Sequence, residues 1–253
     1  MNPGILHRGA VVVGIGLTLL VWGMLAASNE FAGSIPGPMP TLARVVSLFT
    51  SDQLAKDVAQ TVLRWMGGLF PAVLLGSLIG IAIGSSISMF RMFAPTIDFF
   101  RSIPVTAAFP AFLLLFGVGD LSISAMGFAA TLFIVILHAA NGARSVPKTR
   151  LQMAHAFGAT RSQTLLRITM YEALPYILIG GRTALSLALV VTIVSEMLVG
   201  SGLGVGQKIF LSYQLNQLTD MYALILVAGL IGYAGNLFWM LIQEELVPWK
   251  ASQ

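Results

Sequence analysis

The sequence is poor in the residue types with which most soluble enzymes build their chemistry. It contains no cysteine, which excludes disulfide bonds and thiolate metal sites. Only 9% of its 253 residues are charged, whereas an average soluble domain contains about 25%. The three histidines, His7, His138 and His155, are too scattered to indicate a metal site, and no Ser-His-Asp spacing stands out. We therefore predict no catalytic residues, no metal and no cofactor on this chain.

Apolar residues, by contrast, make up 57% of the chain. They form six long runs with few charges, each near the ~20 residues with which a helix crosses a ~30 Å hydrocarbon layer. The runs cover residues 9–28, 65–90, 102–119, 121–141, 183–195 with a continuation past Glu196, and 221–243. Spanning β-strands would need alternating segments of ~10 residues, which the sequence lacks. The runs predict an all-α membrane protein with six transmembrane helices.

The polar stretches between the runs are too short to fold alone, which predicts a single membrane domain over residues 1–253. Residues 1–60 are expected to hold the first helix, an external Pro/Gly linker at 33–40 and an amphipathic segment at 41–60. This segment would lie on the membrane surface or on the bundle. Residues 61–242 would form a core of five helices.

The first apolar run follows His7 and Arg8 and therefore imitates a secretory signal. Its apolar core, residues 10–27, exceeds the ~7 to 15 residues of a signal's apolar region. We expect this run to be a retained first helix.

Basic residues are unevenly distributed between the two sides of the predicted bundle. With the N-terminus inside, ten of the 14 Lys and Arg residues lie on the cytoplasmic side. These are Arg8, Arg91, Arg101, Arg144, Lys148, Arg150, Arg161, Arg167, Arg182 and Lys250. Outside lie Arg44, Lys56, Arg64 and Lys208. This bias predicts that both termini are cytoplasmic, and it accounts for the net charge of +4 without nucleic-acid binding.

The cytoplasmic loop at 145–170 contains the signals of two short helices that meet at a turn. Ser145 and Pro147 stand where a cap and an early helical proline belong. Gly158 stands where a helix ends in the left-handed conformation. Thr160, with Gln163 three residues later, predicts a capping box that begins the second helix.

The first of these helices would contain about eleven residues, too few to span the membrane. Leu151, Ala154, His155 and Phe157 form a small apolar patch on it, among positive charges. Two interpretations are open. The helix packs on its own bundle, or it protrudes and inserts into another protein.

Three segments carry a family resemblance. Residues 152–185 contain Gly158 preceded by Ala154 and followed by Leu174-Pro175. This pattern resembles the cytoplasmic signature of binding-protein-dependent ABC importer permeases. The runs FFRSIPVTAAFPAFLLLFGVG at 99–119 and SEMLVGSGLG at 195–204 are similar to the nitrate, sulfonate, taurine and bicarbonate branch of that family. The similarity covers roughly residues 61–239.

The resemblance implies the type I importer permease fold in a bacterial inner membrane, with a short cytoplasmic coupling helix. It implies a homodimer, two copies of an ABC ATPase subunit, and a periplasmic or lipid-anchored substrate-binding protein. The residues implied to contact the ATPase are Gln152, Met153, Ala154, His155, Phe157, Gly158, Ala159 and Thr160. The chain has no G-x-x-x-x-G-K-[S/T] motif, so ATP would be hydrolysed on a separate polypeptide.

One position departs from the family pattern, because Gln152 stands where the family has glutamate. A neutral amide accepts a hydrogen bond from a partner's arginine more weakly than a carboxylate does.

Two other classes of function compete with an importer. A secondary transporter or channel would show an inverted repeat with charged pairs at the midplane, and a membrane enzyme would show His, Asp or Glu gathered at one depth.

Ionisable residues within the predicted spans are the remaining candidates for a solute pathway. Arg101 lies beside Pro104, which interrupts regular helix. It either reaches the cytoplasmic surface, pairs with Asp98, or lines a pathway for an anionic solute. Glu196 either anchors the glycine-rich turn at 200–204 near the outer face or contacts the solute.

Overall fold

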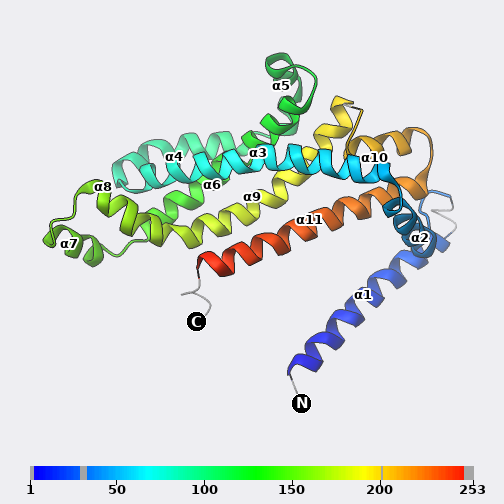
Figure 1. Ribbon diagram of the computed structural model, residues 1–253, viewed down its shortest axis with the longest axis horizontal. Coiled ribbons are helices and arrows are strands. Elements are labelled where there is room, and N and C mark those ends of the chain that lie inside the picture. Colours follow the sequence, from blue (N-terminus) through cyan, green and yellow to red (C-terminus); the bar gives the residue numbers. More distant parts are fainter. Residues whose placement is uncertain (1–2, 29–32, 201, 248–253) are drawn as a thin grey trace.

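The computed structural model describes residues 3–28, 33–200 and 202–247, and the regular elements in that part of the chain are all helices (Figure 1). They are α1 (Pro3–Ala27), α2 (Pro38–Phe49), α3 (Asp52–Gly84), α4 (Ile87–Ser102), η2 (Val105–Ala108), α5 (Phe109–Phe116), α6 (Asp120–Arg144), α7 (Lys148–Ala156), α8 (Arg161–Thr164), η3 (Leu165–Thr169), α9 (Met170–Val199), α10 (Val205–Gln214) and α11 (Leu218–Leu246).

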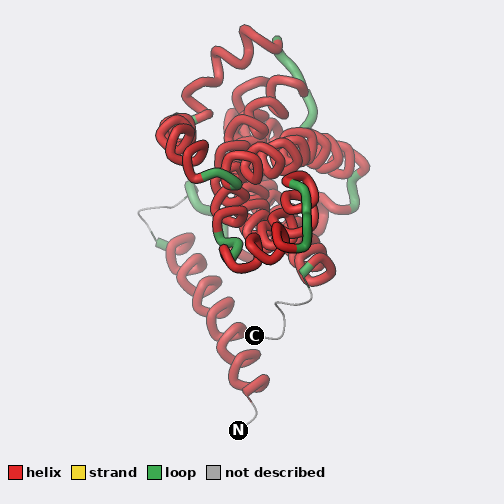
Figure 2. The backbone as a smooth tube through the Cα atoms, turned by 90° about the vertical axis from the view of Figure 1, so that its left-hand side faces the viewer, coloured by secondary structure: helices red, strands yellow, loops and turns green. Residues whose placement is uncertain are grey.

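The long helices α3, α6, α9 and α11 run along the longest axis of the molecule (Figure 1). α2 and α10 lie at one end of this bundle, and α7 and α8 lie at the other. Figure 2, turned by 90°, shows α1 standing apart from the remaining helices. The bundle therefore has two distinct ends, joined by helices that cross its whole length.

Four helices in the described part of the chain are long and apolar enough to cross a membrane. They are Asp52–Gly84, Asp120–Arg144, Leu218–Leu246 and the continuous helix Arg161–Val199, which joins α8, η3 and α9. α4 together with η2 and α5 makes a fifth candidate, bent by 74°. The described apolar part of α1, Val13–Ala27, is shorter. The expected number of six spans therefore stays a prediction.

The bend of α4 and α5 occurs where the sequence predicted an interruption. Ile103 is extended, and Pro104 precedes η2. Proline supplies no backbone N–H to the preceding turn, so the chain changes direction here. The interruption near Pro104 is thus confirmed.

The expected amphipathic segment at 41–60 is wrong as one unit, because the chain breaks at Ser51. The Ser51 side chain accepts a hydrogen bond from the Leu54 N–H and begins α3 there. α3 thus starts thirteen residues before the predicted run at 65–90. Its first four turns consequently carry polar residues into the bundle.

α3 and α6 approach closely because small residues recur every fourth position along α3. Gly68, Ala72, Gly76, Gly80 and Gly84 share one helix face, and all five are buried. A Cβ atom at position 80 would lie 2.5 Å from the Ile136 carbonyl oxygen. Such a stripe of small residues allows two helix backbones to meet without side chains between them.

We predict that Gly80→Val destabilises the protein by about 1–3 kcal/mol or more, because the added side chain overlaps the α6 backbone. The measurement is thermal unfolding in mild detergent, with size-exclusion chromatography to assess folded yield. Gly229→Val in α11 is the matched control, because a Cβ there meets nothing within 4 Å. Equal stability of the two variants would contradict close α3–α6 packing.

Candidate functional site

The loop between α6 and α9 forms the predicted pair of short helices. Gly158 has φ +75°, the left-handed conformation expected at the end of the first helix. Thr160 Oγ1 accepts from the Gln163 N–H at 3.3 Å, while Gln163 Oε1 accepts from the Thr160 N–H at 2.9 Å. The glycine turn and the capping box are both confirmed.

The beginning of α7 differs from the prediction. Ser145 is the C-terminal cap of α6, because its N–H bonds to the Asn141 and Gly142 carbonyls. Pro147 is extended and occupies the N-terminal cap position, so it lies outside the helix. α7 consequently has nine residues rather than about eleven.

The apolar patch expected on α7 is also divided between two faces. Ala154 is buried, whereas Phe157 is 90% exposed. Met153, which was not part of the expected patch, is exposed as well, so the large apolar side chains exposed here are Met153 and Phe157. Gln152, His155 and Thr160 are exposed, and Ala159 is half-buried.

The turn after α7 is closed by its own backbone. The Ala159 N–H donates to the Ala154 carbonyl at 3.0 Å, and the Gly158 N–H donates to the His155 carbonyl at 2.9 Å. An ion pair of Arg150 with Glu172 ties α7 to α9. Phe157 is therefore presented from a fixed turn.

The opposite end of the bundle holds a buried ion pair that the sequence did not predict. Arg64 of α3 contacts Glu196 of α9, with 2.8 Å between Nη1 and Oε1, and their side chains are 3% and 0% exposed. Arg64 also contacts Asp120, the first residue of α6, at 2.7 Å. The Thr61 hydroxyl donates to both Glu196 oxygens at 2.9 and 3.0 Å. Arg64, expected on the outer surface, is thus buried, since α3 carries it inside.

The same side chains cap the first turn of α10, whose N-terminal amides have no intrahelical acceptors. The Gly204 N–H donates to Asp57 Oδ1 at 3.0 Å, and the Val205 N–H donates to Thr61 Oγ1 at 2.9 Å. The Gly206 N–H donates to Glu196 Oε2 at 2.9 Å. Carboxylates also suit the positive end of the helix dipole.

Glu196 therefore anchors the turn that precedes α10, as one of the two interpretations held. Arg64 Nη1 also donates to the Leu203 carbonyl at 2.8 Å, within the same turn. The sequence contains a signal for this site. Asp57, Thr61 and Arg64 are spaced by four and three residues, which places them on one helix face.

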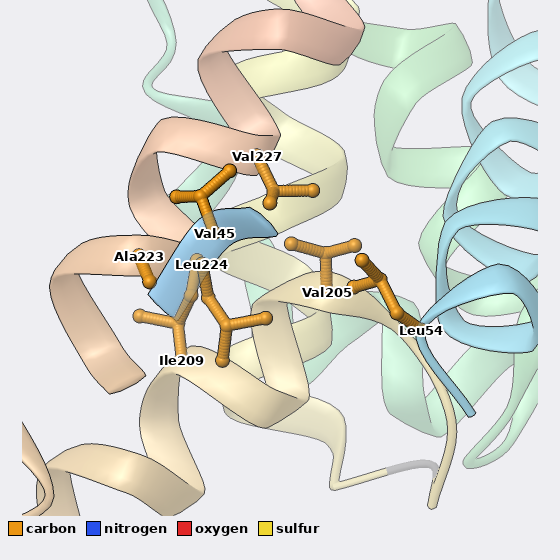
Figure 3. Packing of buried hydrophobic residues seen from close by; sticks show 7 residues of the cluster. All are labelled: Val45, Leu54, Val205, Ile209, Ala223, Leu224 and Val227. Atoms are coloured by element: carbon orange, nitrogen blue, oxygen red, sulfur yellow. The ribbon is translucent and has the colours of Figure 1, made fainter. Parts of the chain in front are cut away.

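Apolar packing surrounds this end of the bundle, as Figure 3 shows. The cluster joins α2, α3, α10 and α11 through Val45, Leu54, Val205, Ile209, Ala223, Leu224 and Val227. Arg44 of α2 adds two hydrogen bonds to Asp220 of α11, at 2.6 and 2.8 Å. α2 is thereby fixed across the ends of α10 and α11.

Arg101 lies in the last turn of α4 and pairs with Asp98 at 3.1 Å. Arg144 lies over the Phe90 ring at 4.0 Å, which places the start of α4 level with the basic end of α6. Arg101 follows Arg91 by ten residues, or ~15 Å along the helix. Its pairing with Asp98, one of the three interpretations, is thus confirmed, and Pro104 nearby is exposed.

Arg182, which the sequence placed on the cytoplasmic side, lies within the continuous helix Arg161–Val199, a candidate membrane span. The predicted run began at 183, whereas α9 begins at Met170, twelve residues or ~18 Å before Arg182. Arg101 and Arg182 are therefore both basic residues within candidate membrane spans. A search for apolar runs missed the first part of α9, because polar residues interrupt the sequence there.

Residues 72–251 match the family described as "Binding-protein-dependent transport system inner membrane component". This match covers more than half of the chain, which therefore belongs to that family, the permeases of ABC transporters.

Three relatives indicate the branch of the family. The taurine transport system permease protein TauC of Escherichia coli (strain K12) is 28% identical, over 93% of this chain and 87% of its own. The putative aliphatic sulfonates transport permease protein SsuC of Bacillus subtilis (strain 168) is 27% identical, over 92% and 85%. The nitrate import permease protein NrtB of Synechocystis sp. is 24% identical, over 93% and 88%. The chain is an ABC permease of the nitrate, sulfonate, taurine and bicarbonate branch.

The fold is shared with a solved structure. A chain of the MetNI methionine ABC transporter, in an inward-facing conformation, superimposes with a TM-score of 0.66. The two sequences are 17% identical, and the match covers 87% of this chain and 99% of that one. The architecture is thus that of the type I importer permease.

We predict that Arg64→Met destabilises the protein by about 3–5 kcal/mol, because it leaves the Glu196 carboxylate buried without a cation. Adding Glu196→Gln should restore part of this loss, since glutamine keeps an acceptor for Gly206 without a charge. Unfolding in mixed micelles measures both.

Arg44→Met is the control, because its pair with Asp220 is partly exposed and should contribute less than about 1 kcal/mol. If Arg64→Met unfolds no more easily than Arg44→Met, the buried ion pair does not hold this end of the bundle together.

Proposed function

We propose that the chain is the transmembrane subunit of an ATP-driven importer and forms the pathway for a small anionic or organic-acid solute. In this proposal it crosses the membrane six times, with both termini in the cytoplasm. The end that carries α7 and α8 is cytoplasmic, and the end that carries α2 and α10 faces outward. Positive charge supports this orientation, because basic residues favour the cytoplasmic side. At the α7 end these are Arg91, Arg144, Lys148, Arg150, Arg161 and Arg167.

The proposed assembly contains two copies of this chain, two ATPase subunits and a periplasmic or lipid-anchored binding protein. The family description, which names binding-protein-dependent transport, supports the last partner. Two copies enclose the pathway between two bundles. ATP-driven closure of the ATPases would then move the α7 turns and rock the bundles between outward-open and inward-open forms.

The observation that carries the coupling proposal is the presentation of Phe157. A large aromatic side chain is 90% exposed on a turn held by backbone hydrogen bonds, at the basic end of the bundle. Aromatic anchors that fill pockets contribute much of the energy of protein interfaces. The proposed ATPase contact comprises residues 152–155 and 157–160.

Gln152 changes the character of this contact. It is exposed and uncharged, so no ion pair forms through it. Docking would therefore depend more on Phe157 and Met153 than on charge.

The solutes named for the relatives support an anionic substrate. Taurine, aliphatic sulfonates and nitrate, named for TauC, SsuC and NrtB, all carry an oxyanion group. Arg101 and Pro104, at the break between α4 and α5, are proposed to line the pathway. Glu196 would shape its outer end through the turn before α10.

Phe157→Ala should weaken binding of the ATPase by about 2 kcal/mol or more. Gly158→Val should impair it too, because valine is strained at φ +75° by about 1–2 kcal/mol although its Cβ meets nothing within 4 Å. Co-purification in mild detergent measures the ATPase recovered per permease. Phe238→Ala, an exposed aromatic on α11, is the control and should behave as wild type.

Wild-type recovery of ATPase with Phe157→Ala would show that the turn is not the contact. If the wild-type chain supports uptake but no ATPase ever co-purifies with it, a secondary transporter or channel would be favoured instead.

Arg101 can be tested separately by anion uptake, normalised to the amount of assembled complex. Arg101→Gln should reduce uptake about tenfold, and Arg101→Lys should retain part of it, because lysine keeps the charge but loses the planar fork. Arg91→Gln, ten residues earlier on the same helix, is the control and should transport normally. Normal uptake by Arg101→Gln would remove this residue from the pathway.

A further inference from the structure

A second polar cluster lies on the face shared by α9 and α11. Arg182 Nε donates to Asn236 Oδ1 at 2.9 Å, and Asn236 Nδ2 donates to Ser186 Oγ at 3.4 Å. Arg182 is exposed, on the side of α9 away from Gly180. Gly180 packs against His138 of α6, because a Cβ atom at position 180 would lie 2.5 Å from the His138 Cβ. Asn236 lies ten residues before the end of α11, or ~15 Å along the helix. The cluster therefore lies within two helices that are long and apolar enough to cross a membrane.

The charge of Arg182 is not compensated by any carboxylate in the part of the chain that the structure describes. Arg64, Arg101 and Arg150 each pair with an acidic residue. The described hydrogen bond of Arg182 goes instead to a neutral amide through Nε. This contact fixes the side chain against α11 through Nε, and no described ion pair joins the two terminal nitrogens to a carboxylate. An uncompensated cation cannot face acyl chains without a large cost, so it must meet water, protein or an anion.

A cavity of about 300 Å³ adjoins Arg182 between the two helices. Its lining consists of Pro175, Ile179, Arg182, Met240, Gln243, Glu244 and Val247. This volume is at the lower end of the range of small-ligand sites. The carboxylate in the lining, Glu244, follows Asn236 by eight residues, or ~12 Å along α11. The cavity thus has a cation, Arg182, within α9 and a carboxylate, Glu244, near the end of α11 in its lining.

We propose that Arg182, positioned by Asn236 and Ser186, binds the oxyanion group of the transported solute on the cytoplasmic half of the pathway. The planar guanidinium offers two parallel N–H donors, which match a sulfonate, carboxylate, nitrate or bicarbonate group. Arg101 suits this task less well, because Asp98 already neutralises it. The inference rests on the proposed transport function and names the site within it.

Charge-selective labelling of an introduced cysteine tests the site directly, since the chain has no native cysteine. Ile179→Cys lines the cavity, and the residue it replaces is 47% exposed. In the complex embedded in lipid nanodiscs, an anionic sulfonatoethyl thiosulfonate should react about tenfold faster than its cationic trimethylammonium counterpart. Adding Arg182→Gln should abolish this preference, and excess methanesulfonate should slow the reaction only when Arg182 is present.

Ile225→Cys is the matched control, because it lies on α11 outside the cavity and is exposed to the same degree, 46%. It should show no preference that depends on Arg182. Failure of Ile179→Cys to react with either reagent would overturn the proposal, because the cavity would then be closed by protein or lipid. Equal rates for both reagents with Arg182 intact would overturn it too.

Uptake of taurine, methanesulfonate, nitrate and bicarbonate completes the test. Arg182→Gln should reduce uptake of the transported anion by about tenfold or more per assembled complex. Arg182→Lys should lose less, because it retains the charge. Normal uptake by Arg182→Gln would refute a role in the pathway. Labelling requires no ATPase and therefore tests the Arg182 site separately from the proposed function. If the cavity is anion-selective but no ATPase co-purifies, the Arg182 site is supported and the proposed ATP-driven import is refuted.

Discussion

Within a membrane, every buried charge and backbone amide must find its partner inside the protein, and the Arg64–Glu196 ion pair meets this constraint for the α10 end of the bundle. Arg64 neutralises Glu196 and reaches the Leu203 carbonyl, while Glu196 accepts from the first turn of α10. α3, α9 and α10 are therefore located by one set of contacts. Close packing of α3 on α6 further fixes the position of Arg64, which also contacts Asp120 of α6.

The two ends of the molecule are joined by one continuous helix. Residues 161–199 extend for 39 residues, or ~58 Å, from the α7 turn to the glycine-rich turn. Glu172 near its start holds α7, and Glu196 near its end holds α10. In the proposed assembly, a displacement of α7 by a docked ATPase would be carried by this helix to the turn before α10. Arg182 lies between the two, where the same movement would change the environment of a bound anion.

Much of this architecture could be predicted from sequence, because apolar runs and local caps are short-range signals. Gly158, the Thr160–Gln163 box and the interruption at Pro104 all follow from backbone chemistry. The buried network could not be predicted, because its residues come from helices more than 130 positions apart. Arg182 was missed for a related reason. A charge ends an apolar run in the sequence, whereas in the structure Arg182 lies within a continuous helix and bonds to Asn236 on its exposed side.

The most direct test of the importer is the energy source of uptake. The complex would be reconstituted in proteoliposomes with its binding protein outside, and uptake of the transported oxyanion measured with ATP or a non-hydrolysable analogue inside. The account predicts uptake with ATP and none with the analogue, whatever ion gradient is imposed. Uptake driven by a proton or sodium gradient in the absence of ATP hydrolysis would contradict it.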